Sequence, residues 1–123
     1  MQNNNAITEE QALKLFEEWK ARLGLYEWRI SFYPFCKPDE LDDESAGTTV
    51  WQEVNKTARI NILDEQYYGD RVVNFDFEKT LVHELLHLKT CLISDTDNEL
   101  QQRIMHQLID DLARSFVDAK RSK

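Results

Sequence analysis

The stretch His83-Glu84-Leu85-Leu86-His87 places two imidazoles four residues apart, with a carboxylate beside the first of them. On an α-helix, residues four apart lie one turn apart on the same face, so both imidazoles can bind one metal ion. Glu84 lies on a neighbouring face, where its carboxylate can reach a water on that ion without being a ligand. This is the chemistry of the HExxH pattern. The spacing predicts a zinc site with His83 and His87 as ligands and Glu84 as general base.

Chance also produces this pattern, and His83 and His87 would then be partly buried polar residues on a leucine-rich helix. Two observations favour a metal site. The chain contains only three histidines, and two of them fall in the pattern. The pattern also lies in a strongly helical segment that follows three predicted strands. We therefore interpret the histidine pair as metal ligands.

Hydrophobic periodicity places the histidine pair within an ordered series of helices and strands. Apolar residues recur at helical spacing after the capping-box residue Thr8, and Gly24 is a typical helix end. Residues 28–32 alternate between apolar and polar, which is typical of a strand, and Pro34 ends that strand. The expected elements are a helix over 9–23, a strand that ends at 34, strands over 47–54 and 58–63, and helices over 77–92 and 97–119.

The order of these elements predicts an α+β fold. Strands that follow one another through short turns favour antiparallel pairing, so we expect a small antiparallel three-stranded sheet. The N-terminal helix, the HExxH helix and the C-terminal helix would cover one side of that sheet. A chain of 123 residues has the size of one domain. Residues 1–123 are therefore expected to form a single domain, with a disordered segment at 1–7.

The charge and the apolar runs restrict the partners and the location of the protein. The net charge is −8 and the isoelectric point is about 4.8, which argues against direct binding to nucleic acid or an anionic membrane. The first residues are polar rather than signal-like, and no apolar run is long enough to span a bilayer. We therefore expect a cytoplasmic protein in which Cys36 and Cys91 are reduced thiols.

The segment FEKTLVHELLHL lies between a predicted hairpin and a second helix, and it resembles the active-site region of zincin metallopeptidases. More narrowly, the chain is similar to the minimal, minigluzincin-like members of prokaryotic cells and phages, and more distantly to SprT-like proteases. The stretch LGLYEWRI adds to this resemblance, which covers most of residues 24–117. It implies a minimal zincin fold, one zinc ion per chain and peptide hydrolysis.

A catalytic zinc has three protein ligands and one open position, so the histidine pair needs a third partner. Cys91 follows His87 by one turn, but a helix rises about 5.4 Å per turn, which puts Cys91 too far from an ion between the two histidines. The last predicted helix offers Glu99 and His106, which are seven residues apart and face the same way. Both remain candidates on spacing alone.

The resemblance bears on this choice. Gluzincins take a glutamate as third ligand from the helix after HExxH, and an acid four residues later accepts a hydrogen bond from a zinc-binding histidine. Asp110 stands four residues after His106 and can accept such a bond, whereas Arg103 follows Glu99 and cannot. Glu99 also fits a structural role as a capping-box acid. We favour His106 as third ligand, with Glu99 as the alternative and Asp110 as the group that orients a ligand imidazole.

The predicted chemistry is peptide hydrolysis by a zinc-activated water, with Glu84 as general base. Tyr67, Tyr68 and Arg103 are the candidate donors to the developing oxyanion. As in zincins, a peptide or unfolded protein substrate would bind as an extended strand along the sheet edge, formed by 47–54 or 58–63. Trp51 is expected in the core rather than in the cleft.

In a second interpretation, the protein binds zinc but does not catalyse a reaction. In that case the chain is a zincin-like binding module that zinc stabilises, acting as a phage or toxin–antitoxin accessory protein. The two interpretations share the ligands and differ in whether Glu84 has a catalytic role.

Overall fold

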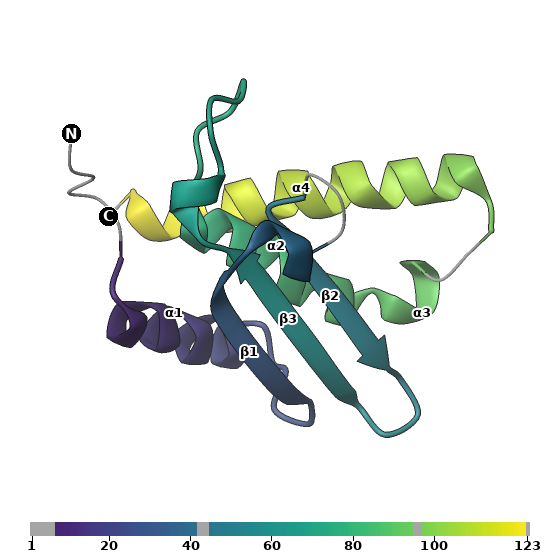
Figure 1. Cartoon of the computed structure of the whole chain (residues 1–123). Coiled ribbons are helices and arrows are strands. Elements are labelled where there is room, and N and C mark those ends of the chain that lie inside the picture. Colours follow the sequence, from purple (N-terminus) through teal and green to yellow (C-terminus); the bar gives the residue numbers. More distant parts are fainter. Residues whose placement is uncertain (1–6, 42–44, 95–96, 123) are drawn as a thin grey trace.

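The computed structural model of the chain describes residues 7–41, 45–94 and 97–122. Helices pack on one side of a three-stranded sheet, which confirms the α+β class (Figure 1). The expected disorder at 1–6 lies outside the described residues, whereas Ile7 packs against the core. The elements are α1 (Glu9–Arg22), β1 (Arg29–Cys36), η1 (Pro38–Glu40), β2 (Gly47–Gln52), β3 (Thr57–Leu63), η2 (Glu65–Tyr67), α2 (Phe77–Lys89), α3 (Cys91–Ser94) and α4 (Glu99–Arg121).

The sheet is mixed, so the prediction of a wholly antiparallel sheet is wrong. Strands β2 and β3 form the expected antiparallel hairpin, but β1 pairs parallel to β3, and the strand order is β1-β3-β2. After β1 and η1, the chain returns to the sheet at β2, which occupies the far edge beyond β3. The side-chain amide of Asn61 donates to the carbonyl oxygen of Glu40 at 3.3 Å and holds the end of η1 against the sheet. A short turn after β1 would have paired β1 with β2 instead.

The helix that carries the HExxH pattern begins as expected. The carboxylate of Asp76 accepts the backbone N–H of Lys79 at 3.1 Å and caps α2, which begins at Phe77. The helix ends at Lys89, three residues before the predicted end, and the short α3 follows. The last helix is capped by Asn98, whose side chain accepts the N–H of Gln101, so Glu99 is its first residue and not a capping-box acid.

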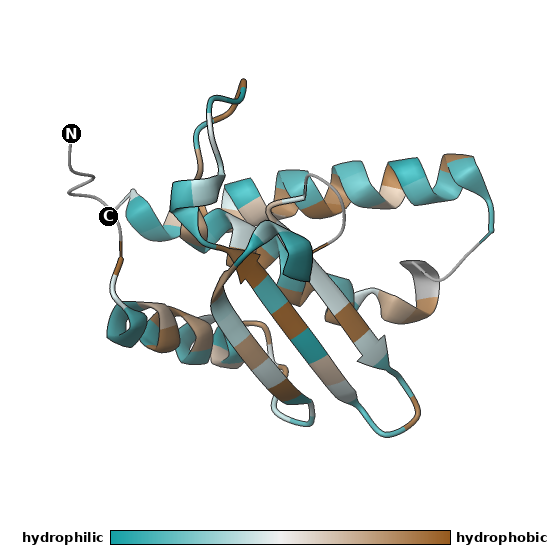
Figure 2. Ribbon diagram, viewed as in Figure 1, coloured by the Kyte–Doolittle hydropathy of each residue, from teal (hydrophilic) through white to brown (hydrophobic). Residues whose placement is uncertain are grey.

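The core lies between the sheet and the helices, and it fixes how α4 packs on α2. Residues of α4 at four-residue spacing face inward and are fully buried, namely Ile109, Ala113 and Val117. They meet Leu81 and Leu85 of α2, which are equally buried in the same cluster. Figure 2 shows apolar residues in the strands, while the visible side of α4 is mostly hydrophilic.

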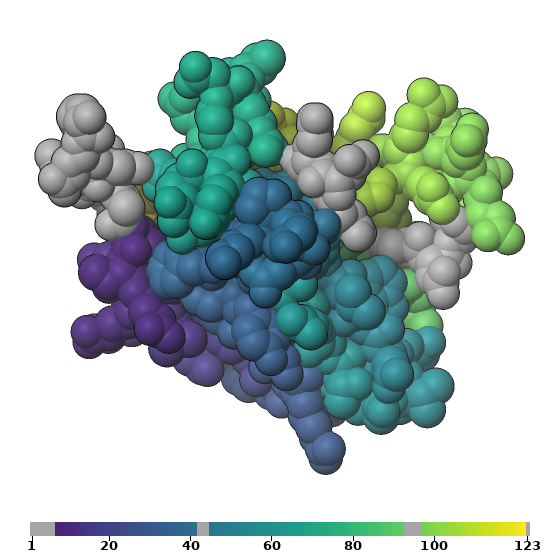
Figure 3. Space-filling view, viewed as in Figure 1, coloured from purple at the N-terminus to yellow at the C-terminus, as the bar shows by residue number. Residues whose placement is uncertain are grey.

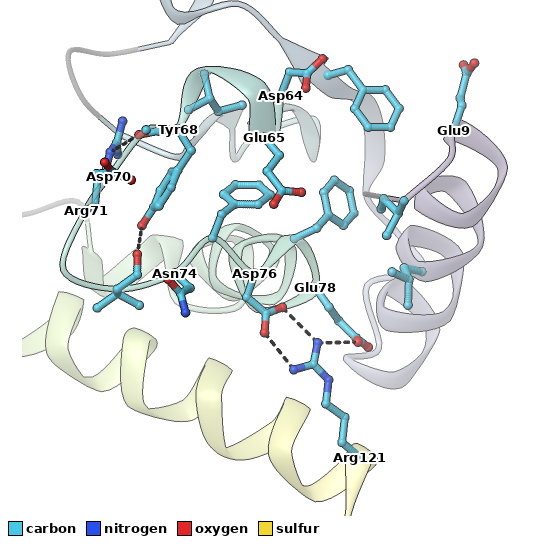
Figure 4. A pocket seen from close by; sticks show the side chains of 18 residues that line it. Glu9, Asp64, Glu65, Tyr68, Asp70, Arg71, Asn74, Asp76, Glu78 and Arg121 are labelled. Carbon is cyan, nitrogen blue, oxygen red and sulfur yellow. Dashed lines mark hydrogen bonds and ion pairs between the residues drawn. The ribbon is translucent and has the colours of Figure 1, made fainter. Parts of the chain in front are cut away.

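An ionic cluster around the buried Glu78 ties three helices together at the start of α2. The carboxylate of Glu78 accepts the indole N–H of Trp19 and the ammonium of Lys120, each at 2.6 Å. Arg121 donates to Glu78 at 3.3 Å and to both carboxylate oxygens of Asp76, and Figure 4 shows its guanidinium between these two acids. This cluster fixes the C-terminal end of α4 beside the N-terminal end of α2.

The segment 68–75 projects from the body between η2 and α2 (Figures 1 and 3). The hydroxyl of Tyr68 donates to the carbonyl oxygen of Val73 at 2.7 Å, and its ring packs on Phe75 with centroids 5.1 Å apart. Arg71 donates to the carbonyl oxygen of Tyr68 at 2.9 Å, and its guanidinium lies over the Tyr68 ring. Tyr68 therefore holds this projecting segment together.

Two sequence expectations concern thiols and membrane spans. Cys36 and Cys91 are both buried free cysteines, as expected. Across the described residues, no helix combines the length and the apolar character that crossing a membrane requires.

Candidate metal centre

The fold brings all three histidines of the chain together. His83 and His87 lie one turn apart on α2, and His106 faces them from α4. Their candidate ligand nitrogens all lie within 4.8 Å of one another. The ring centroids of His87 and His106 are 5.4 Å apart, and those of His83 and His87 are 5.2 Å apart. The favoured third ligand is thus placed beside the predicted pair.

The antiparallel packing of α4 on α2 produces this meeting. Arg121 pairs with Asp76 at one end of the contact, and Lys79 pairs with Asp118 one turn further along. From the pair of Asp76 and Arg121, α2 runs toward higher residue numbers while the part of α4 beside it runs toward lower ones. This register brings Asp110 beside His83 and His106 beside His87. The ionic cluster at the start of α2 therefore helps to place a ligand that lies several turns away.

The donor set fits a zinc ion. Burial, together with the neighbouring His83 and His106, lowers the pKa of His87 to about 4. Burial also lowers the pKa of His83, although Asp110 acts in the opposite direction. Both rings of α2 are therefore neutral at pH 7, which is the form that binds metals. Imidazole nitrogens suit zinc and other transition metals rather than magnesium or calcium.

The spacing of the rings is close to that of a bound site. Zinc–nitrogen bonds of 2.0–2.1 Å in a tetrahedron place the nitrogens about 3.3 Å apart. The nitrogens of His83, His87 and His106 lie within 4.8 Å in the structure. Small side-chain rotations therefore suffice to close the set around one ion.

Asp110 occupies the position predicted for a group that orients a ligand. Its Oδ1 lies 3.6 Å from Nδ1 of His83, which is longer than a hydrogen bond. Its other oxygen lies 3.3 Å from the guanidinium of Arg114, one turn along α4. With Nδ1 turned toward Asp110, the remaining nitrogen of His83, Nε2, is available for a metal.

Glu84 is buried against strand β2, with 6% of its surface exposed. The hydroxyl of Thr49 donates to its Oε1 at 2.5 Å. Burial raises the pKa of Glu84 to about 7, and the hydrogen bond from Thr49 counteracts part of that rise. A carboxyl group with a pKa near neutrality can both accept and release a proton at pH 7.

The three histidines and Glu84 line one open groove of about 1110 Å³. Strand β2 forms one wall, and α2 and α4 form the floor and the other wall. Because β3 is the central strand, β2 is the sheet edge on this side, which resolves the choice between the two hairpin strands. Trp51 lines the groove while packing partly against the core, and its ring lies nearly parallel to that of His87 at 6.3 Å. The core-only expectation for Trp51 is therefore incomplete.

The remaining predicted residues lie elsewhere. Glu99 is exposed in the first turn of α4, and it belongs neither to the histidine cluster nor to the groove lining among the described residues. Tyr67 and Arg103 are exposed and do not line the groove. Tyr68 does line it, but its hydroxyl donates to Val73. The structure thus gives no support to these three as oxyanion donors.

Sequence reasoning missed Thr49, which contacts Glu84 from a position 35 residues away. The alternating pattern of β2 does predict that Thr49 shares one face of the strand with Gly47 and Trp51. That pattern does not reveal which helix the face meets, because the pairing and packing of the strand are set by long-range contacts.

The buried state of Glu84 predicts a pH-dependent stability of the metal-free protein. The folded chain holds the Glu84 proton up to about pH 7, whereas the unfolded chain releases it near the ordinary pKa of 4.5. This group therefore costs the folded state about 3 kcal/mol as pH rises across that window. Glutamine has no proton to lose. We expect the free energy of unfolding of metal-free Glu84→Gln, relative to wild type, to rise by that amount from pH 4.5 to pH 7 in urea titrations.

His87 acts in the opposite sense, since its folded pKa lies below its ordinary value of 6.5. Its contribution to stability is lost as pH falls from 6.5 toward 4, but it is present in both proteins and cancels in the difference. Glu17→Gln, an exposed change on α1, is the matched control and should show no such trend. A stability difference that stays constant across the window contradicts the buried, proton-holding state of Glu84.

Comparison with known proteins provides no relative from which this site could be interpreted. No protein-family model, no curated protein and no solved structure matches the chain.

Proposed function

We propose that the chain is a zinc-dependent metallopeptidase that hydrolyses peptide bonds. The observation that carries this proposal is the convergence of His83, His87 and His106 beside a buried carboxylate in an open groove. Three histidine ligands would leave the fourth position of a tetrahedral ion for water, which is typical of catalytic rather than structural zinc sites. The zincin resemblance of the HExxH segment is consistent with the same chemistry.

The chain's own residues supply the proton transfers. His83, His87 and His106 would hold the ion, and Asp110, 3.6 Å from Nδ1 of His83, would orient that imidazole. When bound, zinc activates a water for attack and polarises the scissile carbonyl. Glu84 accepts a proton from the attacking water and later donates it to the leaving amine nitrogen. A bound cation beside Glu84 would favour its carboxylate form, which is the form that the first transfer needs.

The groove suits an extended peptide in preference to a compact ligand. Strand β2 is an edge strand, and its residues line the groove beside the histidines. An extended substrate can pair with the backbone of such an edge, and the paired backbone supplies affinity without demanding one sequence. We therefore propose peptides and unfolded protein segments as the substrate class.

Metal removal and return tests this function. The protein purified without chelator should contain about one zinc ion per chain and cleave an unstructured protein such as reduced, alkylated casein. Dialysis against a chelator should remove both the zinc and the cleavage, and one equivalent of zinc should restore them. Zinc at a free concentration of 100 times its Kd should raise the free energy of unfolding by about 2.7 kcal/mol.

The outcomes separate the two interpretations of the site. Zinc content below about one-tenth of an equivalent, with no stabilisation on zinc addition, rejects the metal centre. Bound zinc that stabilises the fold without any cleavage by wild type supports the non-catalytic binding module instead. Cleavage that persists after the chelator has removed the zinc points to a contaminating protease.

A further inference from the structure

The hydroxyl of Thr49 lies between two oxygens of Glu84. It is 2.5 Å from the carboxylate Oε1 and 3.2 Å from the backbone carbonyl oxygen of the same residue. A hydroxyl has one hydrogen to donate and two lone pairs, so it can serve one oxygen as donor while it remains an acceptor. Among the described residues, Thr49 is the one side chain that makes a hydrogen bond to the buried Glu84 carboxylate.

Gly47 shows how closely the same strand approaches Glu84. A Cβ atom at Gly47 would lie 3.0 Å from Cγ of Glu84 and 3.1 Å from its Oε2. It would also lie 3.2 Å from the backbone carbonyl oxygen of Asn61, which cannot move aside without disturbing the sheet. A side chain at this position would therefore crowd both Glu84 and the sheet. Strand β2 thus lies close against Glu84 and makes a hydrogen bond to its Oε1.

These contacts place the control of Glu84 in the edge strand. Gly47 and Thr49 are alternate residues of β2, so both point toward α2. Residue Glu84 is 6% exposed, so solvent has little access to fix the orientation of its carboxylate. The strand proposed to pair with the substrate is therefore also the strand that orients the general base.

We propose that Thr49 is the positioning residue for Glu84, holding its carboxylate in the orientation that proton transfer requires. This inference rests on the proposed peptidase function. The two oxygens within reach of the hydroxyl explain why threonine suits this position. Because Thr49 contacts only Oε1 of the carboxyl group, it can keep donating to that oxygen when Glu84 takes up the proton of the attacking water on its other oxygen. The carboxyl group therefore keeps its partner through both transfers.

Two substitutions of Thr49 test this role, because one removes the hydroxyl group and the other removes the methyl group. Thr49→Val keeps the shape and removes the hydroxyl, whereas Thr49→Ser keeps the hydroxyl. We expect Thr49→Val to bind zinc as wild type does and to lose about tenfold to a hundredfold in kcat, part of what a general base contributes, with little change in KM. Thr49→Ser should recover most of the lost kcat. Thr57→Val on β3, whose hydroxyl bonds only within the hairpin, is the matched control and should keep full kcat.

A second measurement does not depend on activity. In protein labelled with ¹³C at the glutamate carboxyl groups, the Glu84 resonance reports the surroundings of the carboxyl directly. We expect Thr49→Val to shift and broaden that resonance, in the zinc-loaded and in the metal-free protein, and Thr49→Ser to keep it near the wild-type position. A substitution that merely loosened the fold would lower the unfolding temperature and alter many resonances together.

The outcomes distinguish this inference from the proposed function. If wild type cleaves peptides and Thr49→Val keeps wild-type kcat, the positioning role is wrong whatever the spectrum shows. If wild type binds zinc but cleaves nothing, the peptidase function fails, and the carboxyl resonance still decides whether Thr49 orients Glu84. An unshifted, sharp Glu84 resonance in Thr49→Val overturns the inference in that case.

Discussion

Glu84→Gln is expected to keep one zinc ion per chain and to lose peptide hydrolysis by about 10²- to 10⁴-fold, the usual contribution of a general base. Glutamine has nearly the same shape as glutamate, so it fits beside Gly47, and its amide oxygen can still accept the hydroxyl of Thr49. The amide cannot take a proton from water at neutral pH. The loss should therefore appear in kcat, measured on a fluorogenic peptide that wild type cleaves.

The interpretation of that result depends on the metal and on the control. Zinc content must be measured on the same preparation, because a variant that has lost its metal is inactive for another reason. Glu17→Gln makes the same chemical change at an exposed position of α1 and should retain full activity. Full activity of zinc-loaded Glu84→Gln would falsify the assignment of Glu84 as base, and a second proton acceptor in the groove would have to be sought.

The HExxH helix and its immediate surroundings could be predicted because their information is local. The apolar spacing of α2, the cap at Asp76 and the four-residue spacing of His83 and His87 depend on contacts within one helix. The same local logic placed Asp110 one turn from His106, because both belong to α4. These relations hold whatever the rest of the chain does.

The arrangement of the sheet could not be predicted in the same way. The alternating pattern of β1 predicts a strand, but it does not indicate which strand pairs with it. Its neighbour is β3, and long-range contacts such as the hydrogen bond from Asn61 to Glu40 accompany this arrangement. The roles of Thr49 and Gly47 depend on the same long-range arrangement. These roles follow from the packing of β2 against α2, which the sequence pattern of β2 alone does not predict.

The third candidate ligand shows most clearly what local spacing can predict and what depends on long-range packing. Spacing alone left Glu99 and His106 as candidates, since both lie on one helix and are two turns apart. The structure places His106 with the other histidines and leaves Glu99 exposed outside that cluster. We expect His106→Ala to weaken zinc binding by about a hundredfold or more, since structural zinc sites bind with about 10–16 kcal/mol in total, which is roughly 3 kcal/mol for each of four ligands. Glu99→Ala should leave the zinc affinity unchanged within about twofold, as expected for an exposed surface change.

Competition with a chromophoric chelator measures both affinities, and the expected order follows from the geometry of α4. Seven residues along an α-helix correspond to a rise of about 10.5 Å, so Glu99 cannot replace His106 without a slide of α4 by two turns. Such a slide would remove Ile109, Ala113 and Val117 from the core and break the contacts of Arg121 and Lys120 with Glu78. The free energy lost by exposing these buried groups exceeds the free energy that one carboxylate ligand to zinc could contribute. Zinc binding that survives His106→Ala and fails in Glu99→Ala would therefore mean that α4 packs on α2 in a different register.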